Sequence, residues 1–141
     1  MHNMEVKVES RVGKMPVNTE ALYRLFSDFR NMTQFIPKDK LRNFQATEDT
    51  CSFEADMVGL VGLKIVERKP NSLVKIISSE ISKYSFTFWV QLKEVATMDT
   101  RIKLTLAFES NPFMAAMFKG QVEKALNSMI DRIEQQNFSY N

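Results

Sequence analysis

Few side chains of this 141-residue sequence offer the groups that catalysis or metal binding requires. His2 is the only histidine and Cys51 the only cysteine, so a zinc or haem site lacks its ligands and a catalytic triad lacks its base. We therefore expect no metal, no cofactor and no catalytic residue. No base or electropositive residue is evident beside Cys51 to lower its pKa, and it is interpreted as a small apolar residue of a strand.

Two other polar residues could contact a ligand. Glu67 shares the alternation of Leu63 and Ile65, so it could point inward at the end of an apolar row, where burial would raise its pKa. The competing interpretation is that the strand ends there and Glu67 is solvated or paired with Arg68 or Arg101. Tyr84 could offer its hydroxyl group to a ligand, or could be a half-buried strand aromatic.

Positive and negative side chains nearly balance, with 19 Lys and Arg against 17 Asp and Glu and a formal net charge of +2. They are interspersed rather than clustered, so we expect no nucleic-acid partner. The opening residues, MHNMEVKVES, lack the apolar stretch of a secretory signal, and no apolar run approaches the ~20 residues of a membrane span. We expect a cytoplasmic protein with no integral membrane segment.

Apolar and polar residues alternate through much of the chain, which is typical of half-buried strands. Short connections, among them a predicted turn over Gly59–Gly62 that could act as a gate, favour an antiparallel meander. The alternation predicts strands near residues 4–12, 42–48, 51–58, 62–69, 73–80, 84–95 and 101–110.

Two short helices are predicted between the first and second strands. The first begins after Asn18 or Thr19, either of which could cap it, and the second covers residues 31–36 and ends at Pro37. Asp28 is interpreted as a cap between them.

A long helix is predicted at the C-terminal end, with Asn111 as its cap and Pro112 as its first residue. It runs for about seven turns and carries one broad apolar stripe. Gly120 in its interior indicates a close backbone approach or a bend.

These elements predict one α+β domain spanning residues 1–141. Two short helices cannot bury the apolar face of seven strands, so the long helix must lie across it. A curved sheet and a straight helix pack imperfectly, and the space between them is a natural pocket.

This order of elements resembles the helix-grip fold of the START-like, or SRPBCC, superfamily, which includes polyketide cyclases and lipid-transfer domains. The resemblance covers about residues 4–136. Its best local match is VNTEALYRLFSDFRNMTQFIP at 17–37, which is similar to the opening of the ubiquinone-binding and ribosome-association-toxin branch. The resemblance implies a seven-stranded curved antiparallel sheet around a long C-terminal helix, with two short helices between strands 1 and 2.

The Phe-rich and Met-rich composition, with 11 Phe and 9 Met, suits walls that adapt to an apolar guest. We expect noncatalytic binding or transport of a lipid-like, quinone-like or aromatic molecule between sheet and helix. The expected ligand-contacting residues lie toward the N-terminal half of the long helix: Phe35, Phe53, Met57, Phe86, Phe88, Met114, Met117 and Phe118.

Two alternatives remain open at this point. A cyclase-like or aromatase-like enzyme would need two polar side chains, such as Glu67 and a tyrosine, converging inside the pocket. An interaction module acting on a chaperone-like or ribosome-like protein partner would need an exposed apolar patch, with Trp89 on the outer face as one candidate anchor.

Overall fold

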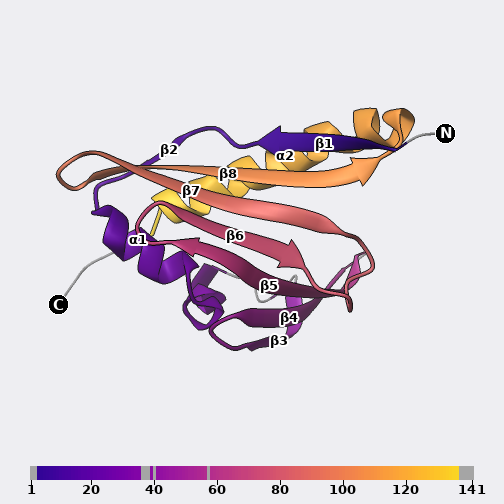
Figure 1. The fold of residues 1–141 in the computed structure, drawn as a ribbon, viewed down its shortest axis with the longest axis horizontal. Helices are drawn as coiled ribbons and strands as arrows, with labels where there is room; N and C mark the ends of the chain where they lie inside the picture. The colour runs from indigo at the N-terminus through magenta and orange to yellow at the C-terminus, as the bar shows by residue number, and fades with distance from the viewer. Residues whose placement is uncertain (1–2, 36–38, 40, 57, 137–141) are drawn as a thin grey trace.

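The computed structural model describes residues 3–35, 39, 41–56 and 58–136, and it shows one twisted antiparallel sheet with a long helix lying against one face (Figure 1). The elements, in chain order, are β1 (Met4–Glu9), β2 (Gly13–Met15), α1 (Thr19–Phe26), the 3-10 helix η1 (Phe29–Phe35), β3 (Leu41–Ala46), β4 (Thr50–Ala55), β5 (Gly59–Lys69), β6 (Leu73–Ser78), β7 (Phe86–Ala96), β8 (Asp99–Ser110) and α2 (Pro112–Glu134).

The predicted α+β helix-grip architecture is confirmed. Seven strands follow the order β1-β8-β7-β6-β5-β4-β3, and β2 adds a short eighth strand that also pairs with β8. All pairs are antiparallel, so the chain meanders from β3 to β8 and closes on β1. The sequence interpretation ended the first strand near Gly13, whereas Gly13 pairs with Ile102 as the start of β2.

The two faces of the sheet differ in chemistry. The inner face, on the side of α2, carries the side chains of Val8, Ile76, Val90 and Leu104, which are all buried. Their neighbours in the strands point to the outer face, because side chains alternate along a strand. Trp89 lies on that outer face between two lysines, with the Nζ of Lys7 5.4 Å and the Nζ of Lys75 5.8 Å from its ring centroid.

Each helix begins at a side-chain cap. The Oδ1 of Asn18 accepts a hydrogen bond from the N–H of Ala21 at 2.9 Å, and the Oδ1 of Asn111 accepts one from the N–H of Met114 at 2.8 Å. Pro112 occupies the first turn of α2, where a missing N–H costs nothing. Among the described residues, no helix is both long and apolar enough to cross a lipid bilayer.

The structure tests two expectations about glycines. The expected turn over residues 59–62 is wrong: these residues begin β5, and the described turn residues Asp56 and Val58 precede them. Gly59 is the glycine with a left-handed backbone there, at a φ of 89°. A Cβ built on Gly120 would meet nothing within 4 Å, so of its two predicted explanations the close backbone approach is wrong, and the bend stays a prediction.

Candidate functional site

The inner face of the sheet is sealed at one end and partly open at the other. Along β7, Val90 and Leu92 are buried, whereas Phe86 and Phe88 are only half-buried. The same change occurs along β8, from its buried first half to half-buried Leu106 and Phe108. Register places Phe86 opposite Phe108 and Phe88 opposite Leu106, so these side chains form one continuous apolar surface. We call it the open end.

The open end extends onto the far strands. Phe53 on β4 pairs with buried Val61 on β5, and its ring stacks on Phe44 of β3 with centroids 6.3 Å apart and planes at 20°. Both rings are half-buried. Phe44 was not among the expected site residues, although its alternation with Ala46 marks it as inward-facing.

A polar clamp fixes how α2 is rotated about its own axis. The Arg11 backbone N–H donates to Asn127 Oδ1 at 2.7 Å, and the Arg11 guanidinium donates to Glu134 Oε1 at 2.6 Å and also to Asp131. The N–H of Lys14 donates to the second oxygen of Glu134 at 2.8 Å. One flank of α2 is therefore attached to the link between β1 and β2. The opposite flank must face across the inner side of the sheet.

That opposite flank is apolar. Phe118 lies about 60° around the helix from buried Ala115, and Met129 lies about 60° from buried Leu126, because each residue advances about 100°. Met114 is half-buried on the same flank. Phe118 keeps 38% and Met129 41% of their surface exposed, so packing against the sheet leaves this flank uncovered.

Two apolar residues of α2 point elsewhere. Met117 lies nine residues before buried Leu126, which places it about 180° around the helix. It is 54% exposed, and Phe113 is 71% exposed. The structure thus puts the expected ligand residue Met117 on the solvent side of α2, and offers Met129 on the flank that faces the sheet.

Of the two interpretations of Glu67, the inward-pointing one is wrong. A β-bulge between Ile65 and Glu67 inserts one residue into β5, so Glu67 pairs with Lys75 on the outer face. Its carboxylate lies 3.7 Å from the Nζ of Lys69, close to the alternative of a solvated or paired side chain. The same bulge moves Arg68 to the inner row, opposite Val74.

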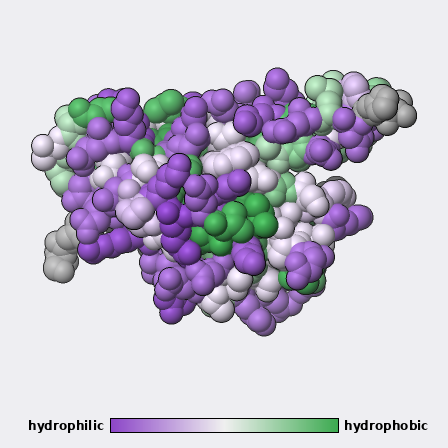
Figure 2. All heavy atoms as spheres, in the orientation of Figure 1, coloured by the Kyte–Doolittle hydropathy of each residue, from purple (hydrophilic) through white to green (hydrophobic). Residues whose placement is uncertain are grey.

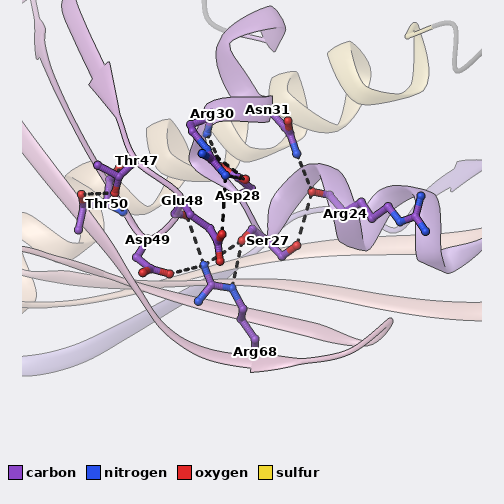
Figure 3. A network of polar contacts seen from close by, with 10 residues as sticks. All are labelled: Arg24, Ser27, Asp28, Arg30, Asn31, Thr47, Glu48, Asp49, Thr50 and Arg68. Atoms are coloured by element: carbon purple, nitrogen blue, oxygen red, sulfur yellow. Dashed lines mark hydrogen bonds and ion pairs between the residues drawn. The ribbon is translucent and has the colours of Figure 1, made fainter.

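Arg68 is the centre of a polar network that joins three segments (Figure 3). Its guanidinium donates to the carbonyl oxygen of Ser27 at 2.9 and 3.0 Å, to that of Glu48 at 3.3 Å, and lies 2.7 Å from Asp49 Oδ1. The network therefore fastens the junction of α1 and η1, and the turn between β3 and β4, onto β5.

Asp28 caps η1 within this network, as expected. It accepts a hydrogen bond from the N–H of Arg30 at 2.9 Å, and the Arg30 side chain binds both of its carboxylate oxygens. These hydrogen bonds hold the pKa of Asp28 below its usual value.

The remaining expected site residues are placed as follows. Tyr84 is exposed in the segment between β6 and β7, with the Nζ of Lys83 5.5 Å from its ring centroid, so the interpretation as a half-buried strand aromatic is wrong. Met57 and the side chain of Phe35 lie outside the described residues. Cys51 is buried on β4, as expected of an apolar strand residue, and burial raises the pKa of its thiol to about 12.

A separate hollow of about 550 Å³ lies on the outer face, beside β3, β4 and β5. Gln45, Ser52 and Lys64 line it, and the segment after β6 closes it with Glu80 and Ile81. The outer face is otherwise largely hydrophilic, apart from an apolar cluster over β5 and β6 (Figure 2), where register turns Ile77 outward and Val66 is exposed. No three potential metal ligands of the described chain come together.

The chain is similar in structure to several solved proteins. Truncated norcoclaurine synthase from Thalictrum flavum superposes with a TM-score of 0.77 at 8% identity, over 100% of this chain and 98% of that one. The Mll3558 protein from Rhizobium loti gives 0.69 at 12% identity, over 95% and 98%. CalU16 from Micromonospora echinospora gives 0.59 at 10% identity, over 94% and 84%.

No protein-family model matches the chain, and no curated protein matches it in sequence. At sequence identities this low, structural similarity shows only that the folds are alike. The agreement nevertheless spans nearly the whole length of both chains in each comparison with a TM-score of 0.69 or above. Together with the strand order and the long C-terminal helix, it shows that the chain has the helix-grip fold.

Proposed function

We propose that this domain binds a hydrophobic small molecule between the open end of the inner face and the apolar flank of α2, without transforming it. The observation that carries the proposal is the pair of facing, incompletely covered apolar surfaces. Phenylalanines from β3, β4, β7 and β8 form one surface, and Met114 and Phe118 of α2 form the other.

The energetics favour a guest at this place. Removing apolar surface from water stabilises by roughly 25 cal/mol per Å², and a folded chain gains most where its aromatic side chains are fully covered. Phe86, Phe88 and Phe108 face inward and are still half-buried. A ligand that covers the exposed part of these three side chains would therefore gain affinity from the apolar surface that it removes from water.

Noncatalytic binding is favoured over catalysis because the inward polar groups Arg68 and Ser78 already have hydrogen-bond partners within the protein. Arg68 already binds two backbone carbonyls and Asp49. Ser78 Oγ accepts a hydrogen bond from the N–H of Phe86 at 2.9 Å. A cyclase-like or synthase-like activity, of which norcoclaurine synthase is a structurally similar example by name, would need polar groups that are free to meet a substrate.

Native mass spectrometry of the protein purified from its own host, followed by solvent extraction, tests the proposal. We expect a stoichiometric apolar molecule to copurify. Phe118→Ala should lower its occupancy several-fold, because Phe118 lies on the flank that faces the sheet.

Phe113→Ala is the matched control, since it removes the same side chain from the solvent side of the same helix. It should leave occupancy unchanged. Recovery of no bound molecule, with no uptake of apolar probes by the purified protein, would refute the proposed function. Equal losses in the two variants would place binding elsewhere.

A further inference from the structure

We propose that the ligand of this site is uncharged and carries an aromatic ring, an inference that rests on the proposed binding function and narrows it to one chemical class. Two independent observations lead to it. One concerns the charges of the inner face, and the other concerns the geometry of its aromatic side chains.

The described inward positions of strands β4 to β8 offer no free counter-charge at the open end. The inward positions there carry apolar side chains and two hydroxyl groups, that of Ser78, which is hydrogen-bonded to Phe86, and that of Ser110 at the end of β8. The two charged inward residues lie beyond the open end. Arg68 is engaged by Ser27, Glu48 and Asp49.

Glu94, the other charged inward residue, continues β7 past buried Leu92 and pairs with buried Thr100 at the sealed end. It accepts a hydrogen bond from the N–H of Thr19 at 3.4 Å. An anionic ligand at the open end would therefore lose its hydration without gaining an ion pair from these strands. Burying a charge without a partner is strongly unfavourable, so carboxylates and phosphates are selected against.

The aromatic side chains favour a ring over a flexible hydrocarbon chain. Phe44 and Phe53 already stack at 6.3 Å and 20°, which leaves a pair of half-buried ring faces and edges at the far side of the open end. Stacked and edge-to-face ring pairs gain affinity beyond their buried area, and a Met thioether adds a favourable contact with a ring. Met114 supplies a thioether from the facing helix flank.

The test compares three probes of similar size at neutral pH by isothermal titration calorimetry: 2-naphthol, which is neutral and aromatic, 2-naphthoate, which is anionic and aromatic, and 1-decanol, which is neutral and aliphatic. We expect 2-naphthol to bind tightest and 2-naphthoate to bind at least ~30-fold more weakly. Phe53→Leu keeps an apolar side chain but removes a ring. It should weaken 2-naphthol by roughly 3-fold to 10-fold and change 1-decanol by less than about 2-fold.

Phe44→Leu provides a second variant of the stacked pair, and Phe113→Leu is the control on the solvent side of α2. Binding of 2-naphthoate as tight as that of 2-naphthol would overturn the neutral part of the inference. Tighter binding of 1-decanol, or equal effects of Phe53→Leu on both neutral probes, would overturn the aromatic part. Binding of none of the three would instead refute the proposed function.

Discussion

The guanidinium of Arg68 donates to the backbone carbonyl oxygen of Ser27 through both Nε, at 3.0 Å, and Nη2, at 2.9 Å. Ser27 ends α1, and Arg68 lies 41 residues later on β5. This contact exists because a bulge in β5 turns Arg68 inward in place of Glu67. Alternation along the strand pointed to Glu67 as the inward polar side chain. The side chain that faces inward is instead its neighbour in sequence, Arg68.

Arg68→Met should destabilise the domain by about 2 kcal/mol, since it removes hydrogen bonds from a charged donor and leaves partly buried carbonyl oxygens without their partner. Urea unfolding followed by circular dichroism measures the change. Arg42→Met is the matched control, because Arg42 makes a surface ion pair with Asp56 and should have little effect. Equal destabilisation by the two substitutions would contradict the role of Arg68 as the centre of the network.

Two glycines allow a paired prediction. A Cβ on Gly62 would lie 2.2 Å from Ser79 Oγ and 2.5 Å from Ile81 Cγ1, whereas one on Gly120 would meet nothing. Gly62→Ala should therefore cost about 1–3 kcal/mol through overpacking of the segment after β6. Gly120→Ala should stabilise by about 0.5–1 kcal/mol, because alanine is the better helix former.

Thermal unfolding of both glycine variants checks the signs. The prediction requires the two shifts to be opposite. A stabilised Gly62→Ala protein would mean that Ser79 and Ile81 move aside without a cost in free energy. The segment that borders the outer hollow would then be loosely packed.

Patterns that depend on local chemistry could be predicted from the sequence. Asn111 and Pro112 fixed the start of α2, and unbroken alternation placed the inward faces of β7 and β8 correctly. Predicting which face a side chain occupies requires regular alternation along the strand, and a β-bulge interrupts that alternation. Glu67 is turned outward by a bulge at Val66, and nothing about a valine in a strand signals a bulge.

The rotation of α2 also depended on contacts distant in sequence. The apolar stripe of the helix is broad, so periodicity alone assigned Met117 and Phe118 to the same surface. The clamp from Arg11 to Glu134 spans 123 residues and decides which flank faces the sheet. That contact cannot be derived from the spacing of residues along the helix.

Cys51 should be unreactive in the folded protein. Burial raises the pKa of its thiol to about 12 from an ordinary 9.0, which lowers the thiolate fraction at a given pH by roughly 1,000-fold. With a thiol-specific reagent at about pH 8, we expect modification at least roughly 100-fold slower than in concentrated guanidinium chloride. Fast modification of the native protein would show that β4 opens readily at the edge of the site.

Acid should weaken the clamp that orients α2. Hydrogen bonds from Arg11 and from the N–H of Lys14 hold the pKa of Glu134 below its usual 4.5. The folded state therefore binds fewer protons at this carboxyl than the unfolded chain. The stability it contributes is present above about pH 4.5 and is lost as the pH falls through the lowered folded-state pKa.

Glu134→Gln should cost about 1 kcal/mol at neutral pH, because the charge-assisted bonds to Arg11 become weaker. The cost should shrink toward zero below the pH at which the wild-type carboxyl is protonated, since both proteins then carry a neutral group there. Urea unfolding of both proteins at neutral pH and at about pH 3 measures the two differences. A cost that stays constant with pH would mean that Glu134 acts through its shape rather than its charge, and that the rotation of α2, with Phe118 facing the sheet, does not depend on this ion pair.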